Sequence, residues 1–264
     1  MRIPRDARYE ARSRLTRLNV ELHTHRRPDG RVVVWPNGWW TPDQARWATE
    51  YARSNGLTVI THVAADRTDE SRVLIDAGFA AARREVTVEV DLDEALAAIG
   101  DARLPAGVAT ISAADADIER LRLLDDALRH DIPGTAGWRS TPKQFADDNF
   151  GDSAFDRRTY LVAVDERDGE YIGLVRVWMN RSGPRIGMFG VLPAHRRRGI
   201  TLALLARCLR VARDEGHRAV TSEFDETNGA SAGVFERISA RRTGSTTELA
   251  LEPPPSREVG RDSS

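Results

Sequence analysis

The sequence predicts a mixed α/β fold, in which a mostly antiparallel sheet flanked by helices follows a shortened α/β segment. Three β-rich runs at 159–165, 171–179 and 185–191 are separated by Asp-Gly and Ser-Gly turn signals. A helical pattern over 200–215 follows the third run directly. We therefore expect the second half of the chain to form a complete α+β unit.

The first half alternates between short strand and helix patterns. Thr41, with Pro42 at the first helical position and Gln44 at the third, predicts a helix start, and Gly56 predicts its end. The expected elements are a strand at 32–35, a helix at 41–55, a strand at 58–63, a helix at 70–77 and a strand at 85–90. The loop at 36–40 carries no arginine, so we do not expect it to bind a phosphate.

The second half starts with a strand pattern at 107–112 and a helical pattern at 114–129. Thr141, Pro142 and Gln144 predict the next helix start, because they repeat the cap, proline and glutamine spacing. Beyond the three strands and the long helix, we expect a strand at 219–224, a helix at 229–238 and a strand at 246–251. The polar, proline-rich residues 253–264 are expected to be a disordered tail.

The composition excludes several functional classes. With 41% hydrophobic and 30% charged residues and a net charge of −1, the chain reads as an ordinary soluble protein with no overall signal for nucleic acid or membranes. Its single cysteine, Cys208, excludes an internal disulfide and a cysteine-rich zinc site. His23 and His25 have no further ligand cluster, so we expect no metal site. We see no targeting segment or apolar span, which predicts a cytoplasmic protein.

The two halves share a spacing that indicates an internal repeat. Gly56 and Gly216, which end equivalent predicted helices, lie 160 positions apart, and Gly78 and Ser239 lie 161 apart. A spacing kept across two elements favours duplication over two unrelated α/β segments of similar length.

The loop between the strand at 185–191 and the helix at 200–215 predicts an anion site. The first N–H groups of a helix have no intrahelical partner, and the helix dipole adds partial positive charge there. Gly199 permits close approach of the backbone, and three consecutive arginines at 196–198 add charge. A pyrophosphate fits this combination.

With its order of hairpins, Arg-x-x-Gly loop, helix, strand and helix, the chain resembles the GCN5-related N-acetyltransferase (GNAT) family. Arg196, Gly199 and Thr201 occupy the positions of the family loop signature, and Asn228 matches its second marker. The resemblance covers 105–252 in full and 30–92 as a degenerate partial copy, a tandem layout similar to that of mycothiol synthases. It implies a partial domain at 1–100 and an acetyltransferase domain at 105–252.

The chain departs from the family pattern at three places. Thr201 stands where a small residue is usual, so its hydroxyl either crowds the phosphate or caps the helix and donates to the same anion. Phe235 stands where a tyrosine usually protonates the leaving thiolate, and Ser239-Ala240 stands where Gly-Phe is usual. In the first half the closing pair is intact as Gly78-Phe79.

The resemblance implies acetyl-CoA as co-substrate. In the family fold a bulge splays the strand ending at Val191 from the strand at 219–224, and the pantetheine arm binds to the exposed edge. The implied contacts with acetyl-CoA come from Phe189, Gly190, Val191, Arg196, Arg197, Arg198, Gly199, Ile200, Thr201 and Asn228.

The implied reaction is transfer of the acetyl group to a primary amine of a small molecule or peptide. Glu223 is the best-placed base, ahead of Asp225 and Asp131, and Trp138 and Asp131 are the expected acceptor contacts. Two alternatives stay open. One is a non-catalytic acyl-CoA-binding or regulatory protein, because Phe235 cannot donate a proton and no clear base is visible. The other is a structural pseudo-enzyme that has lost binding through Thr201 and whose first half mediates dimerisation. We expect a monomer or homodimer, with the first half as scaffold and pocket wall.

Overall fold

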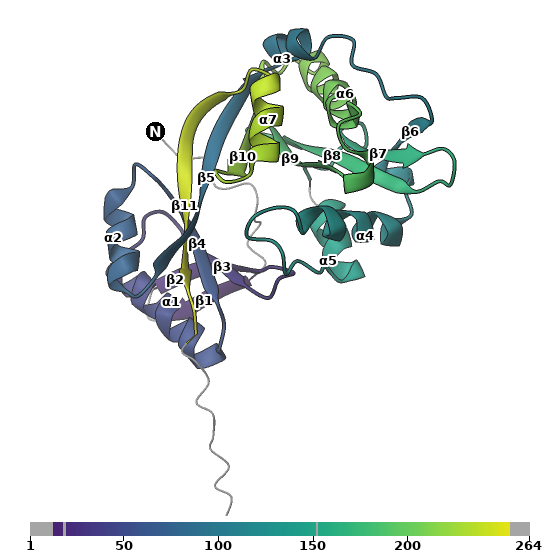
Figure 1. The fold of residues 1–264 in the computed structure, drawn as a ribbon. Coiled ribbons are helices and arrows are strands. Elements are labelled where there is room, and N and C mark those ends of the chain that lie inside the picture. The colour runs from purple at the N-terminus through teal and green to yellow at the C-terminus, as the bar shows by residue number, and fades with distance from the viewer. Residues whose placement is uncertain (1–12, 18–19, 152, 254–264) are drawn as a thin grey trace, which may run out of the picture. The chain divides into compact units, whose positions relative to one another are not determined.

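The computed structural model describes residues 13–17, 20–151 and 153–253. By its contacts the chain divides into two compact units. We call 84–246 the C-terminal unit, and 8–83 with 247–264 the N-terminal unit. The boundaries fall inside two long strands, β5 (Ala80–Asp91) and β11 (Arg241–Leu251), as the colours of Figure 1 help to follow. The predicted tail at 254–264 lies outside the described residues.

The N-terminal unit contains a sheet covered by two helices. Its strands are β1 (Ser13–Arg17), β2 (Val20–Arg26), β3 (Val32–Pro36), β4 (Val59–Ala64) and the last part of β11, in the order β1-β2-β3-β4-β11. The helices are α1 (Pro42–Asn55) and α2 (Thr68–Asp76). Buried side chains of both helices, including Ala48 and Leu74, pack with Leu22, Val34 and Val59 from the strands. β1 was not predicted.

Helix α1 begins and ends where the sequence predicts. The Thr41 side chain accepts a hydrogen bond from the Gln44 backbone N–H at 3.3 Å, and Gln44 Oε1 accepts one from the Thr41 backbone N–H at 3.0 Å. This capping box satisfies two backbone donors that the first turn leaves free. Gly56 ends the helix in the left-handed conformation, with φ 60°.

The C-terminal unit is built on a larger mixed sheet. Its strands lie in the order β11-β5-β10-β9-β8-β7-β6. Besides β5 and β11, these strands are β6 (Val108–Ser112), β7 (Tyr160–Asp165), β8 (Tyr171–Asn180), β9 (Gly183–Val191) and β10 (Ala219–Asp225). The helices are α3 (Leu92–Ile99), α4 (Ile118–Arg129), α5 (Pro142–Asn149), α6 (Ile200–Asp214) and α7 (Gly229–Arg237). This architecture confirms the predicted mixed fold with flanking helices.

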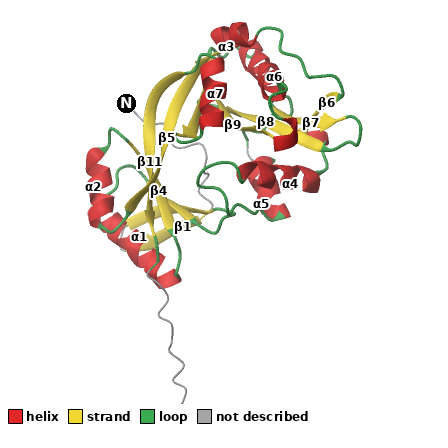
Figure 2. Ribbon diagram, in the orientation of Figure 1, coloured by secondary structure: helices red, strands yellow, loops and turns green. Residues whose placement is uncertain are grey.

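Helices cover both faces of this sheet, as the ribbon in Figure 2 shows. On one face the core joins α6 and α3 to the strands, with Leu204, Leu205 and Leu209 fully buried. On the other face Leu121, Leu124 and Leu128 of α4 pack with Phe145 of α5 and with β7 and β8. The two cores hold the sheet rigidly between them, so its central strands can position a site.

Three expectations about elements need correction. The helix expected at 114–129 is a 3₁₀ turn, Ala113–Asp115, followed by α4, which begins only at Ile118. Two caps cause the break, because Ser112 accepts from the Ala114 N–H and Asp117 accepts from the Arg120 N–H. Helix α3 was not predicted. Strands β5 and β11 are longer than expected, since their outer parts are exposed and show no apolar alternation.

Among the described residues, none of the helices combines the length and the apolar character that crossing a membrane requires. In the same residues, histidine, cysteine and carboxylate side chains form no group of three or more that could hold a metal ion.

Candidate functional site

A bulge in β9 opens the middle of the sheet. Arg176 pairs with Met188 and Val177 pairs with Ile186, so Gly187 is an extra residue without a partner in β8. Among the described residues, Thr221 and Arg185 form the one parallel pair between β10 and β9. Beyond that pair β9 and β10 separate, and the β9 edge from the bulge to Val191 keeps N–H and C=O groups without a strand partner. The predicted bulge and splay are confirmed.

The bulge depends on glycine because of its crowded surroundings. A Cβ atom at position 187 would lie 2.5 Å from Nε1 of Trp178 and 3.5 Å from Nε of Arg176. These two side chains already stack, with the Arg176 guanidinium 4.8 Å from the Trp178 ring centre. Any side chain at 187 would therefore have to displace the Trp178 indole from its stacked position on Arg176.

The loop from β9 to α6 presents backbone N–H groups. A 3₁₀ turn, Pro193–His195, is followed by Arg197 and Gly199 in the left-handed conformation, at φ 60° and 78°. Among the described residues, no group accepts from the N–H groups of Arg197, Arg198 and Gly199. No side chain caps the start of α6, so the Thr201 hydroxyl does not act as a cap. Successive free N–H groups at a helix N-terminus form a concave site for an anion.

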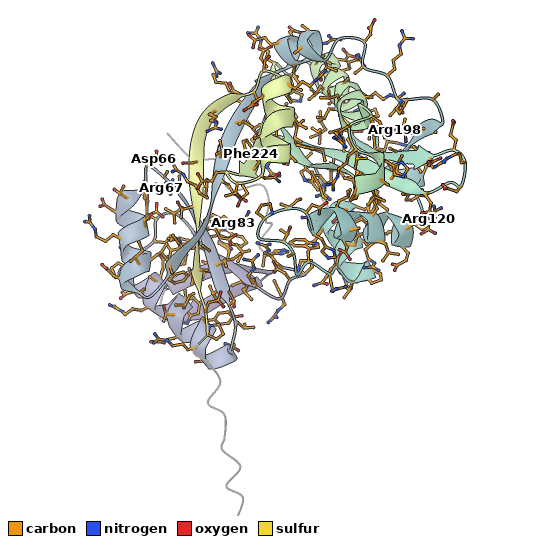
Figure 3. All side chains as sticks on the ribbon, viewed as in Figure 1. Asp66, Arg67, Arg83, Arg120, Arg198 and Phe224 are labelled. Carbon is orange, nitrogen blue, oxygen red and sulfur yellow. The ribbon has the colours of Figure 1, made fainter. Side chains whose placement is uncertain are left out.

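The side chains of the loop brace it and add charge. Arg196 Nε donates to the Val191 carbonyl at 2.9 Å, which ties the loop to the end of β9. Arg198 Nη1 lies 3.3 Å from Nδ1 of His195 (Arg198 is labelled in Figure 3). Arg196, Arg197 and Arg198 are all exposed. The loop therefore offers both backbone donors and positive charge to solvent.

The structure brings two predicted site residues into direct contact. The Arg196 guanidinium forms an ion pair with Asp131, and their side chains are 45% and 54% exposed. Asp131 starts the segment 131–140, which also carries Trp138. The Trp138 ring packs under the guanidinium of Arg129, at 4.1 Å. Both residues that were predicted to contact the amine substrate thus lie beside arginines. Asp131 also links this segment to the loop from β9 to α6.

Three phenylalanines form a wall on the α7 side of the opening. Phe235 is 3% exposed, with its ring centre 5.5 Å from Phe189 of β9 and 5.2 Å from Phe224 of β10 (Phe224 is labelled in Figure 3). Edge and stacked contacts of this kind favour a closely packed aromatic cluster. Phe235 thus packs where the two strands separate and has no proton to give.

The predicted base, Glu223, has an arginine partner that the sequence did not reveal. Arg185 Nε donates to Glu223 Oε2 at 2.8 Å, and Arg185 Nη2 lies 2.6 Å from the same oxygen. The two side chains are 14% and 15% exposed. Asn228, the predicted pantetheine contact, caps α7 by accepting from the Ser231 N–H at 3.1 Å, which leaves its Nδ2 group uncommitted.

A buried polar cluster under α4 and α5 was also missed. Arg176, 5% exposed, donates to Asn149 Oδ1 and lies 3.7 Å from Asp125 Oδ1, while Arg129 Nε donates to Asp125 Oδ2 at 2.6 Å. Tyr160 adjoins the cluster, and burial raises the pKa of its hydroxyl. The one available signal was Arg176 itself, a charged residue in the middle of an otherwise apolar strand.

In the N-terminal unit, the loop between β3 and α1 corresponds to the loop from β9 to α6. A carboxylate accepts a hydrogen bond from one of its backbone N–H groups. The Trp40 backbone N–H donates to Glu70 Oε2 at 3.3 Å, and Glu70, 5% exposed, pairs with Arg67 at 2.8 Å. Arg67 in turn stacks on Trp39 at 4.1 Å. A carboxylate beside this loop repels anions, which gives a physical reason for the expectation that no phosphate binds here.

The mixed sheet is opened by a bulged central strand, and a loop with free N–H groups and a helix lie at the open end. This arrangement defines the acetyltransferase class of fold. Residues 125–239 match the Acetyltransferase (GNAT) family. No curated protein sequence matches the chain.

Solved structures extend the similarity of fold over both units. A GCN5-related N-acetyltransferase from Sphaerobacter thermophilus aligns over 89% of this chain and 77% of its own, with a TM-score of 0.66 and 18% identity. A tandem GNAT protein from the clavulanic acid biosynthesis pathway aligns over 90% and 80%, with a TM-score of 0.66 and 19% identity. A GCN5-related N-acetyltransferase from Kribbella flavida aligns over 92% and 90%, with a TM-score of 0.60 and 15% identity.

Proposed function

We propose that the C-terminal unit binds acetyl-CoA and transfers its acetyl group to a primary amine of a small molecule or peptide. The observation that carries the proposal is the separation of β9 from β10 beside the free N–H groups of Arg197, Arg198 and Gly199. A strand edge and an anion site next to each other suit a ligand with an amide-containing arm and a pyrophosphate.

In this proposal each end of acetyl-CoA has its own contacts. The pantetheine arm pairs with the β9 edge at Phe189, Gly190 and Val191, and the N–H groups from Arg196 to Thr201 hold the pyrophosphate. Asn228 can donate from Nδ2, because only its Oδ1 is used in the helix cap. The Gly199 position fits close approach, since nothing lies within 4 Å of where its Cβ would be.

The reaction requires proton transfer from the amine and proton transfer to the leaving thiolate. The amine, with an ordinary pKa of about 10, must lose a proton before its lone pair attacks the thioester carbon. In the tetrahedral adduct the nitrogen loses a further proton to solvent, the C–S bond breaks, and CoA leaves as a thiolate whose conjugate thiol has a pKa of about 8.5. We assign the proton lost before attack to Glu223, directly or through water. Phe235 cannot supply a proton to the thiolate, so solvent protonates it.

One test separates binding from chemistry. Thermal unfolding with acetyl-CoA at about 100 times its Kd should show about 2.7 kcal/mol of added stability, or about 5–10 °C for a chain of this size. Acetyl-pantetheine, which lacks the pyrophosphate, should give a much smaller shift. Amines that accept the acetyl group should then release free thiol, detected with a thiol reagent. No shift with acetyl-CoA would contradict the proposal.

A non-catalytic acyl-CoA-binding protein is the second candidate. Phe235 at the usual acid position and the pairing of Glu223 with Arg185 favour it, because both reduce the means for proton transfer. The same experiment distinguishes the two candidates. A thermal shift with acetyl-CoA but no thiol release with any amine would favour the binding protein.

Glu223→Gln should lower kcat by about 100-fold and leave the KM for acetyl-CoA within about twofold, because it removes the base but keeps the shape. Initial rates at saturating amine test this. Glu89→Gln on the adjacent strand β5, where Glu89 pairs with the exposed Arg241, makes the same change in charge and should leave kcat unchanged. Equal rates for the Glu223 variant and the wild type would remove Glu223 from the mechanism.

A further inference from the structure

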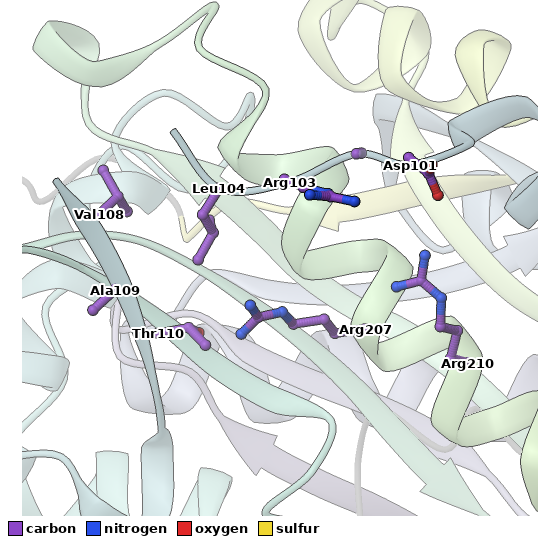
Figure 4. A pocket seen from close by; sticks show the side chains of 9 residues that line it. Asp101, Arg103, Leu104, Val108, Ala109, Thr110, Arg207 and Arg210 are labelled. Atoms are coloured by element: carbon purple, nitrogen blue, oxygen red, sulfur yellow. The ribbon is translucent and has the colours of Figure 1, made fainter. Parts of the chain in front are cut away.

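A groove on the C-terminal unit lies away from the proposed acetyl-CoA site. It has a volume of about 570 Å³ and is bordered by α6, by the segment after α3 and by β6, the edge strand of the sheet. Figure 4 shows Arg207 and Arg210 extending from α6 toward Arg103, Asp101 and Thr110 across it. Two strands, β7 and β8, separate β6 from the opening beside β9.

Arginine side chains give the groove an excess of positive charge. Arg103, Arg207 and Arg210 line it, against a single acidic residue, Asp101. Within the part of the chain that the structure describes, none of these three guanidinium groups forms an ion pair or a hydrogen bond. Arg213, one turn further along α6, does pair, with Asp214 at 3.3 Å. Three unpaired arginines around one hollow repel each other, and an anion between them would relieve that repulsion.

Part of the groove lining is apolar. Leu104, Val108 and Ala109 line it, and Val108 is 7% exposed. Thr110 is the one hydroxyl residue in the lining, and its Oγ1 donates to the Val162 carbonyl at 3.2 Å, so it is oriented toward the protein as a donor. A ligand here meets both guanidinium groups and aliphatic side chains. That combination suits an organic anion better than a bare inorganic ion.

We infer that this groove binds a small organic anion carrying two or more negative charges. Guanidinium groups bind phosphate and carboxylate oxygens through paired N–H donors, so either group can provide the charge. The volume lies within the range of about 300–1,000 Å³ that is typical of small-molecule sites. The groove is a single hollow with no aromatic side chain for stacking bases, which disfavours single-stranded nucleic acid.

Calorimetric titration of the full chain tests the inference, with CoA present at saturation so that the acetyl-CoA site is filled. ATP and citrate serve as phosphate and carboxylate probes, and uncharged adenosine is the control ligand. We expect ATP or citrate to bind with a Kd below about 1 mM, and adenosine not to bind. The probe that binds identifies the anionic group.

The variant pair decides whether the binding occurs in the groove. Arg207→Ser with Arg210→Ser should weaken binding of the probe by at least about tenfold, because each charged hydrogen bond contributes about that factor. Arg213→Ser, on the same helix but outside the groove, should change nothing. Both variants should keep the circular dichroism spectrum of the parent. Absence of binding by both probes, competition by CoA, or equal binding by the double variant would overturn the inference.

Discussion

Gly199→Trp is expected to weaken acetyl-CoA binding by at least about 100-fold, equivalent to about 2.7 kcal/mol. Gly199 has φ 78°, a conformation that side chains rarely adopt, so a tryptophan would shift the backbone just where three N–H groups converge. Its indole would also cover those groups. No clash within the protein contributes, since nothing lies within 4 Å of the Cβ position. Calorimetric titration with acetyl-CoA measures the loss.

Gly216→Trp is the matched control for this change. Gly216 follows the other end of α6, has φ 88°, and likewise has nothing within 4 Å of its Cβ position. The two variants therefore strain the backbone similarly, and both should lose similar thermal stability. Only the variant at 199 should lose acetyl-CoA binding. Tight binding by that variant would show that the loop N–H groups do not hold the pyrophosphate.

Glu248→Gln is expected to destabilise the N-terminal unit by about 3 kcal/mol at neutral pH. The carboxylate is fully buried, and it lies 2.9 Å from Arg83 Nε, 3.1 Å from Arg31 Nη1 and 3.3 Å from His62 Nε2 (Arg83 is labelled in Figure 3). Arg27, 2% exposed, lies 3.6 Å away. Asp29 also pairs with Arg27 and Arg31, at 2.8 Å and 2.9 Å, so removing the Glu248 carboxylate leaves this buried positive charge only partly compensated, which is more damaging than losing an exposed ion pair.

The effect should depend on pH in a defined direction. Burial raises the pKa of Glu248, but the hydrogen bond from His62 and the charges of Arg83 and Arg31 outweigh it and lower the pKa to about 2. A carboxyl group with a depressed pKa in the folded state stabilises the fold above its unfolded pKa of about 4.3. That contribution is lost as the pH falls from there toward 2, so the wild type and the variant should converge in acid.

Hydrogen exchange of the β4 and β11 amides, with and without urea, follows this unit specifically. Glu252→Gln is the control, because Glu252 is exposed and accepts from Thr58 Oγ1 at 2.6 Å near the end of the same strand. It should reduce protection by less than about 1 kcal/mol. Equal losses for the two variants, or a Glu248 effect unchanged at low pH, would contradict the role assigned to the buried carboxylate.

Local sequence was enough to predict most of the elements and the loop from β9 to α6. The capping boxes at Thr41 and Thr141 formed as expected, because each involves residues only three positions apart. The helix after Gly199 was predicted from its apolar periodicity alone, and it ends within one residue of the expected position. Two caps, Ser112 and Asp117, compete at short range. There the pattern predicted a single helix, and that prediction was wrong.

The pairings within the candidate site and the buried charges depend on distant parts of the chain. Arg196 meets Asp131 across 65 positions, Arg185 meets Glu223 across 38, and Arg31 meets Glu248 across 217. No periodicity encodes such partners, since they come together only when strands and helices pack. The sequence by itself therefore determined most of the helices and strands, the bulged acetyltransferase fold and the position of the loop before α6. The partner of Glu223, the charge around Glu248 and the arginine groove were decided only by the tertiary structure, because ion pairing requires the two groups to lie close together in the folded chain.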